Sequence, residues 1–450
     1  MTAMRFRLRP ACFASIGLAL VALAARGESP AAFDGRGIPS PPQRGCRVGG
    51  PGAGCVAPPS NISDILGRRA LPAGRLARLG ATLDFHHGLL WVPAHAAEKP
   101  RAVAGNGTLI VGTYPDKFWI IDEATEKVVG NIPFKSGIPR RTTLSRDRKR
   151  FYTVEAGMEK VEILDIASRT TLDTFTLSEG SKKVRIRSLE PDPLHRFVMM
   201  VTASATKLVD RFEIGAPTLV QYDLKEHKIV RTIPWPNGEE RQNVQIQFAP
   251  DGKLMYLFTD QDVLIYDTEK FAQIDKWELS KPIEEGFGRL EFGASDILND
   301  EPGYYTALFN VSDPVQHRRI MGIGRVNLSA KTVDFYTLGP TSPLSFTLAP
   351  GRKVGYGLFQ DIGRYEFWKF DLEHRKLAGR TEFVGRPRMS LKTSSNGKVL
   401  YIYGAGNTID LWDAETYQYL RTITLEGDMT AELFVFPTPP AAAAAPSAGK

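Results

Sequence analysis

The chain has 450 residues, of which 42% are apolar and 24% are charged, and its formal net charge is +7 at pH 7. These values are ordinary for a soluble globular protein and leave enough apolar residues for a large core. The positive charge is mild for this length, so it argues against a nucleic-acid partner.

Residues 1–27 have the pattern of a secretory signal peptide. Arg5, Arg7 and Arg9 form a basic start, the apolar run CFASIGLALVALAA follows, and Ala22-Leu23-Ala24 has the small-x-small form of a cleavage site. The apolar run is too short for a membrane span. We therefore predict export to the periplasm or the extracellular space, with no membrane span after the signal is removed.

The three cysteines limit the possible metal and cofactor chemistry. Cys12 would leave with the signal, while Cys46 and Cys55 lie in a segment rich in Pro and Gly. These two could pair in an oxidising compartment, or they could be an incidental pair in a flexible leader. The rest of the chain has no cysteine, which excludes thiolate metal sites and heme attachment through C-x-x-C-H.

Two segments lack sustained periodicity. Residues 28–104 are rich in Gly, Pro, Ala and Arg and are predicted to be a largely disordered leader, with one short helix around 62–79. Residues 437–450, PTPPAAAAAPSAGK, are predicted to be a disordered tail.

Between these segments, a strand ending in Asp or Asn and followed by a short polar turn recurs seven times. The successive spacings are 43, 58, 44, 60, 44 and 42 residues, and four of the six match the ~40–45 residue period of a four-stranded propeller blade. The two longer spacings indicate loop insertions. The recurring residues, which we expect to accept backbone N–H bonds in their turns, are Asp122, Asp165, Asp223, Asp267, Asn327, Asp371 and Asp413.

Seven such units predict an all-β fold over residues 105–436, a seven-bladed β-propeller of four-stranded antiparallel blades. The first unit shows only three strands, whereas the segment AELFVF, Ala431–Phe436, remains after the last unit. We expect this C-terminal strand to complete the first blade and to close the ring.

Two stretches carry a resemblance to a known family. They are FAPDGKLMYLFTDQDVLIYDTEKFAQIDKWEL, Phe248–Leu279, and the equivalent KVLYIYGAGNTIDLWDAETYQYLRTITL near the end of the repeats. They resemble the YVTN-type seven-bladed propellers, within the quinoprotein amine dehydrogenase β-chain-like superfamily. The resemblance implies a propeller and leaves the activity open, because the superfamily holds catalytic, electron-transfer-associated and binding members. The methylamine dehydrogenase heavy chain, which supports a partner subunit bearing the redox cofactor, is one such scaffold.

Arginines gather where we expect chain links to lead into inner strands, on the face that we call the top. Guanidinium groups around a channel mouth would favour a carboxylate, a phosphate or an acidic protein surface. They could equally pair with nearby carboxylates such as Glu239, Glu240, Glu284 and Glu285. The candidate binding residues at these links are Arg140, Arg141, Arg185, Arg187, Arg241, Arg289, Arg386 and Arg388.

The two long spacings add insertions that we expect on the same face. Ser204–Thr218 lies in the third unit, and Ser312–Met321 lies in the fifth. Long loops on a rigid scaffold commonly carry recognition, although these could be neutral elaborations. The second insertion adds the candidates His317, Arg318 and Arg319.

No catalytic residue, metal ligand or cofactor site is predicted. Beyond the leader the histidines are His195, His227, His317 and His374, and we expect only His317 on the top face, so they cannot converge on a metal. The leading hypothesis is an exported binding or assembly platform for a protein partner or a small anionic ligand. The alternatives are a propeller enzyme, namely a lactonase-like hydrolase or a quinone-dependent amine dehydrogenase subunit, and a cell-surface adhesin.

Overall fold

The computed structural model describes residues 102–238, 240–242, 244–259, 262–279, 288, 290–293, 296, 298–404 and 406–437, and two short paired strands, β1 (Thr82–Asp84) and β2 (Leu89–Trp91). The chain forms two compact units, residues 1–97 and 98–450, and the second is described below. The predicted signal peptide, Cys46 and Cys55, the helix expected around 62–79, and almost all of the predicted leader and tail lie outside the described residues.

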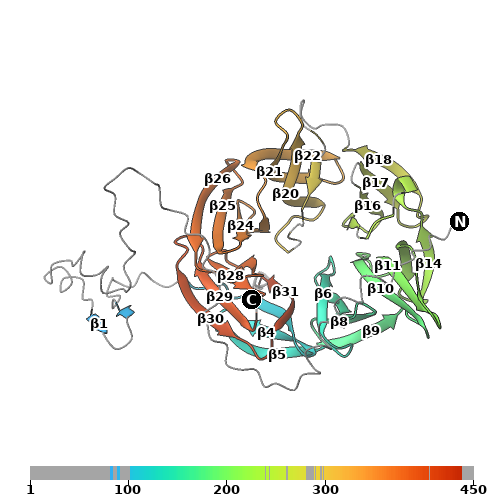
Figure 1. Cartoon of the computed structure of the whole chain (residues 1–450), viewed down its shortest axis with the longest axis horizontal. Helices are drawn as coiled ribbons and strands as arrows, with labels where there is room; N and C mark the ends of the chain where they lie inside the picture. The colour runs from blue at the N-terminus through green and yellow to red at the C-terminus, as the bar shows by residue number, and fades with distance from the viewer. Residues whose placement is uncertain are drawn as a thin grey trace, which may run out of the picture. The chain divides into compact units, whose positions relative to one another are not determined.

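Seven antiparallel sheets stand in a ring, which confirms the predicted all-β propeller (Figure 1). Each sheet, here called a blade, has four main strands that follow the chain from the ring's centre outward, except that blade 1 begins with the C-terminal strand. Blade 1 consists of β31 (Met429–Phe436), β3 (Thr108–Thr113), β4 (Lys117–Asp122) and β5 (Lys127–Pro133). Blade 2 consists of β6 (Pro139–Leu144), β7 (Arg150–Glu155), β8 (Lys160–Asp165) and β9 (Thr170–Thr176). Blade 3 consists of β10 (Lys182–Pro191), β11 (Phe197–Lys207), β13 (Thr218–Asp223) and β14 (Lys228–Ile233), with β12 (Phe212–Ile214) paired to β11.

The remaining four blades follow the same order. Blade 4 consists of β15 (Gln245–Phe248), β16 (Leu254–Phe258), β17 (Asp262–Asp267) and β18 (Gln273–Glu278). Blade 5 consists of β19 (Leu290–Phe292), β20 (Tyr304–Asp313), β21 (Arg318–Asn327) and β22 (Thr332–Pro340). Blade 6 consists of β23 (Leu344–Leu348), β24 (Val354–Asp361), β25 (Arg364–Asp371) and β26 (Lys376–Phe383). Blade 7 consists of β27 (Ser390–Thr393), β28 (Val399–Tyr403), β29 (Thr408–Asp413) and β30 (Tyr419–Thr424).

The residue types in each strand depend on the position of the strand between the centre and the rim of the ring. The second strands are buried on both faces by the neighbouring blades, and all five residues of β28, VLYIY, are buried. Outer strands such as β26 alternate between exposed and partly buried residues because one face meets solvent. The only helix in the described part of the chain is the 3₁₀ turn η2 (Pro236–Gly238), and none there has the length and apolar character needed to cross a bilayer.

The recurring Asp and Asn residues form the predicted Asx turns. Each side chain accepts a backbone N–H three residues later, at distances between 2.7 and 3.0 Å. Because these bonds favour the carboxylate, the pKa values of Asp122, Asp165 and Asp371 are lowered. The prediction that these residues organise the turns is therefore confirmed.

The residue four positions after each anchor has a left-handed backbone, with φ between 50° and 60°, and none of the seven is Gly. This conformation costs a non-glycine residue about 1 kcal/mol or more. The side chain at this position can offset that cost because the turn reaches the preceding blade. Its contacts include Glu126 with Arg421, His227 with Asp173, Lys331 with Asp275, Arg375 with Asp334, and the ring of Tyr417 on Phe367.

The ring closes between blades 7 and 1. Strand β31 pairs with β3, so the C-terminal strand completes the first blade, as the sequence predicts. The carboxylate of Glu123, fully buried, accepts hydrogen bonds from the backbone N–H of Gly107 at 2.7 Å, the backbone N–H of Ser395 at 2.8 Å and the Tyr401 hydroxyl at 2.9 Å. This one side chain therefore joins the first strand of the chain's repeats to the last blade.

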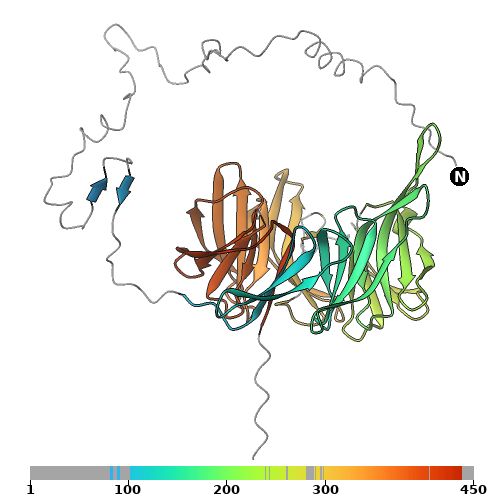
Figure 2. The same ribbon diagram turned by 90° about the horizontal axis from the view of Figure 1, so that it is seen from below.

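Strand direction defines two faces of the ring. The top face holds the turns between second and third strands and the links into inner strands, and the bottom face holds the other turns. The Ser204–Thr218 insertion is a hairpin of β11 and β12 that rises above the top face, drawn in green in Figure 2. Its tip exposes Val209, Phe212 and Ile214.

Replacing Glu123 tests the closing seam. Glu123→Ala leaves two backbone N–H groups and the hydroxyls of Ser395 and Tyr401 without their acceptor, so we expect a loss of about 3 kcal/mol in the free energy of unfolding, measured with urea. Glu123→Gln keeps one acceptor oxygen and should lose less. Glu415→Ala on the surface of blade 7 removes only an exposed pair with Lys369 and should cost less than about 1 kcal/mol. Equal losses for Glu123→Ala and Glu415→Ala would contradict the role of the seam.

Candidate functional site

Four of the predicted arginines lie together on the inner strands of blades 2 and 3. Arg140 and Arg141 are at the start of β6, and Arg185 and Arg187 are near the start of β10. The two strands are neighbours in the ring, and the Thr143 hydroxyl on β6 donates to the Leu189 carbonyl on β10 at 3.3 Å. We call these four residues the arginine cluster.

Each of the two strands has an irregularity at an arginine. The pairing of β6 with β7 skips Arg140, and the pairing of β10 with β11 skips Arg187. A bulge of this kind redirects a side chain and interrupts the regular alternation of a strand, and bulges are frequent next to functional sites. This is why consecutive or alternate arginines on these strands can point toward one region.

The charges in the cluster repel one another. The pKa of the Arg141 guanidinium is lowered, first because part of the side chain is withdrawn from water and then because Arg140 and Arg187 repel its charge. Within the described residues, no carboxylate forms an ion pair with Arg140, Arg141 or Arg185. Of the carboxylates that could neutralise the predicted arginines, Glu239, Glu284 and Glu285 lie outside the described residues.

The other predicted residues are placed around the same face without joining the cluster. Arg241 precedes β15, and Arg386 and Arg388 precede β27. Arg386 is paired with Asp410 at 3.1 Å, and Arg318 is paired with Asp313 at 3.3 Å. His317, Arg318 and Arg319 are exposed at the turn between β20 and β21, while Arg289 lies outside the described residues.

The histidines lie where the sequence predicts them, three on the bottom face and His317 on the top. The three at the bottom contact carboxylates of nearby turns and strands: His195 contacts Asp147, His227 contacts Asp173, and His374 contacts Asp371. No group of three or more His, Cys, Asp or Glu side chains in the described part of the chain could hold a metal ion.

A connection that the sequence did not reveal crosses the bottom face. Leu298, in the segment before β20 of blade 5, packs into the core between blades 1 and 2, and its carbonyl accepts a hydrogen bond from Arg148 at 2.9 Å. Near this crossing, burial raises the pKa of Glu190 to about 8, against the attraction of Arg146. A carboxyl group is thus kept protonated near neutral pH beside the crossing.

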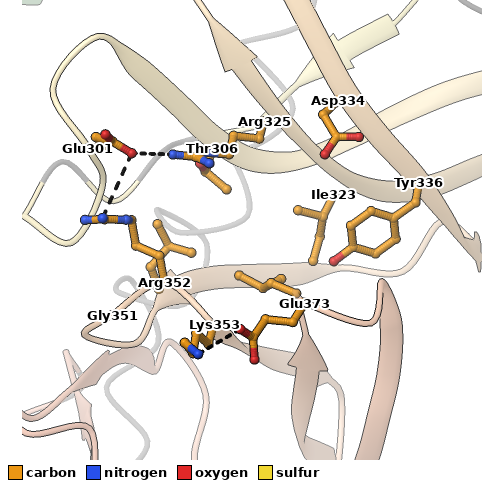
Figure 3. A pocket seen from close by; sticks show the side chains of 12 residues that line it. Glu301, Thr306, Ile323, Arg325, Asp334, Tyr336, Gly351, Arg352, Lys353 and Glu373 are labelled. Atoms are coloured by element: carbon orange, nitrogen blue, oxygen red, sulfur yellow. Dashed lines mark hydrogen bonds and ion pairs between the residues drawn. The ribbon is translucent and has the colours of Figure 1, made fainter.

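A cleft of about 380 Å³ lies between blades 5 and 6 at the bottom face (Figure 3). The sequence does not reveal this cleft, because its walls come from several strands and turns of two blades. Charged side chains of both signs line it, with Ile323, Leu348 and Leu372 between them. Tyr336 lines the cleft (Figure 3), and its hydroxyl is buried without a hydrogen-bond partner among the described residues.

The sequence matches no protein-family profile and no curated protein. Among solved structures, the chain is similar to dihydro-heme d1 dehydrogenase NirN in complex with DHE, at 11% identity, covering 73% of this chain and 75% of that chain with a TM-score of 0.46. It is also similar to a functionally unknown protein from Desulfotomaculum acetoxidans, at 11% identity, 74% and 99% coverage and a TM-score of 0.46. A third similar structure is Kuenenia stuttgartiensis hydrazine synthase, at 11% identity, 75% and 100% coverage and a TM-score of 0.41. Similarity at this level transfers no site and no activity to this chain.

The raised pKa of Glu190 gives a pH-dependent stability. Because the folded protein holds this proton more tightly than the unfolded chain, the stability falls as pH rises from about 4.5 toward 8, by up to about 1.4 kcal/mol per pH unit. Glu190→Gln removes the proton exchange, so we expect it to raise the unfolding free energy more at pH 8 than at pH 5. The exposed Glu226→Gln should show no such difference, and a pH-independent effect of Glu190→Gln would contradict the assignment.

Proposed function

We propose that the protein is an exported YVTN-type β-propeller that acts as a binding or assembly platform, with the arginine cluster as its contact site. The observation that carries the proposal is the grouping of Arg140, Arg141, Arg185 and Arg187 on two bulged, adjacent inner strands. Three of these side chains lack a carboxylate partner among the described residues, and Arg141 is repelled by its neighbours.

An anion at the cluster would lower this repulsion. Guanidinium groups hold carboxylates and phosphates through two parallel N–H bonds, and strands of a closed ring fix the groups before binding. The partner class that fits is therefore an acidic protein surface or a small phosphate or carboxylate. The rigid strands hold the positively charged arginines close together, whereas a flexible loop would let them move apart.

The proposed organisation extends to the rest of the chain. Residues 1–27 would direct export to the periplasm or the extracellular space, residues 28–104 would serve as a leader, and 437–450 as a tail, around the propeller of residues 105–436. The insertion tips at Val209 and Val315, exposed on the same face, would add apolar contacts around a protein partner.

Charge reversal in the cluster tests the proposal. Titration calorimetry with inorganic pyrophosphate and with an oligoglutamate peptide measures the binding of a small anion and of an acidic protein surface. We expect Arg141→Glu combined with Arg187→Glu to weaken binding of the preferred probe by about tenfold or more, since each substitution turns attraction into repulsion. Circular dichroism and the unfolding midpoint should show a folded ring.

Lys149→Glu is the matched control, because Lys149 is exposed on the same blade at the opposite face. It changes the net charge per substitution equally and should leave binding unchanged. Binding of both probes by the double variant at the wild-type level, or an equal loss in Lys149→Glu, would exclude the cluster as the contact site.

A further inference from the structure

The hairpin of β11 and β12 projects from the top face of blade 3. The last residue of β11 that pairs with β13 is Thr202, opposite Thr218, so the chain beyond it leaves the body of the blade. Residues 203–209 span roughly 20 Å at about 3.3 Å per residue. The tip of the hairpin therefore stands clear of the ring, as Figure 2 shows.

Strand pairing gives this hairpin one apolar face. Ile214 of β12 lies opposite Ala205 of β11, and Phe212 lies opposite Lys207. Because residues two apart on a strand point to the same side, Phe212 and Ile214 share one face of the hairpin. They are 66% and 71% exposed, and Val209 at the tip is fully exposed. Nothing in the described part of the chain covers this apolar patch, and uncovered patches of this kind mark contact sites.

Basic side chains flank the apolar patch. Lys207 lies beside Phe212, and Lys182 of β10 lies opposite Thr206 of β11. Both lysines are exposed, and neither forms an ion pair with another described residue. Lys183 and Arg211 pair with Glu159 and Asp210. Within residues 181–185 and 203–215 the acidic residues are Asp210 and Glu213, and the basic residues are Lys182, Lys183, Arg185, Lys207 and Arg211.

The size and shape of the patch favour a lipid surface over a protein as its occupant. A stable protein contact buries about 800 Å² on each partner, which three side chains at a convex tip cannot supply alone. A bilayer interface accepts a few aromatic and aliphatic side chains, and anionic lipids add attraction for nearby lysines. An apolar tip flanked by lysines is thus complementary to acyl chains beneath a layer of phosphates.

We propose that this hairpin docks the protein on an anionic lipid bilayer. Val209, Phe212 and Ile214 enter the boundary between head groups and acyl chains, and Lys182 and Lys207 contact lipid phosphates. The Val209 tip then meets lipid and not a protein partner. Because the tip stands clear of the ring, the arginine cluster stays open to its own anion. The proposal goes beyond the contact site at the arginine cluster and does not depend on it.

Co-sedimentation of the full chain with lipid vesicles tests the proposal. One set of vesicles contains phosphatidylcholine and phosphatidylglycerol in equal parts, and the other contains phosphatidylcholine alone. We expect the anionic vesicles to bind the protein about tenfold or more tightly, and this binding to weaken as NaCl rises from about 0.05 to about 0.5 M, because salt screens the lysines. No binding to the anionic vesicles, or equal binding to both sets, would overturn the proposal.

Phe212→Ser combined with Ile214→Ser tests insertion of the apolar face. We expect about tenfold or more weaker binding to the anionic vesicles, because the area that enters the bilayer is lost, and an unchanged unfolding midpoint, because both side chains are exposed. Leu194→Ser combined with Ile274→Ser is the matched control, since these exposed residues lie in a bottom turn of blade 3 and on β18. Any contribution of residues 1–27 is the same in all variants. Unchanged binding in the first pair, or an equal loss in the second, would overturn the assignment.

Lys182→Gln combined with Lys207→Gln tests the charged flank. We expect about tenfold weaker binding to the anionic vesicles, because each lysine near an anionic surface contributes roughly fivefold. Lys149→Gln combined with Lys225→Gln removes the same charge from exposed residues of the bottom face and should leave binding unchanged. Equal losses in the two pairs would show that net charge alone drives binding and would overturn the role of the hairpin.

Discussion

The antiparallel pairing of β31 with β3 is the interaction on which the molecule depends. A four-stranded blade buries its two faces only against neighbours, so an open row of seven would expose an apolar face at each end. Pairing the last strand with the first removes both open ends. The seam also holds a fully buried carboxylate, Glu123, and the pair of Lys392 with Glu432 at 2.8 Å between the inner strands of blades 7 and 1. Polar groups placed here make the correct closure specific, because any other pairing would leave them unsatisfied.

Away from the seam, one position in each blade also links that blade to the preceding one, and the type of residue at this position differs from blade to blade. The left-handed residue after each Asx turn is acidic in blade 1, basic in blades 2, 5 and 6, histidine in blade 3 and aromatic in blades 4 and 7. The turn fixes the direction of this side chain, and in six of the seven blades the preceding blade contacts it with an acid, a base or an aromatic ring. Backbone geometry is thus repeated around the ring while the side-chain pairs vary, so neighbouring blades are not interchangeable.

The two faces of the closed ring carry different groups of side chains. On the top face, adjacent inner strands can hold Arg141 and Arg187 near one another despite their repulsion, because the sheet contacts supply the stability that the charges cost. On the bottom face, the segment containing Leu298 crosses from blade 5 to blade 2, and the cleft of Tyr336 opens between two outer strands and turns. The rigid scaffold therefore presents different groups of side chains on its two faces.

The sequence by itself determined the repeat, the turns and the closure, because each depends on residues close together in the chain. The spacing of the Asp and Asn anchors, the β-branched runs between them, and the surplus strand at 431–436 were sufficient. It also indicated which arginines share a face, since strand direction alone decides that. The tertiary structure decided which charged groups lie near each arginine. Arg386 and Arg318 form ion pairs with carboxylates, whereas Arg141 lies near other arginines. The sequence predicted neither the seam at Glu123, which joins residues 272 positions apart, nor the cleft at Tyr336. Bulges, rotamers and contacts between blades have no local signature in the chain.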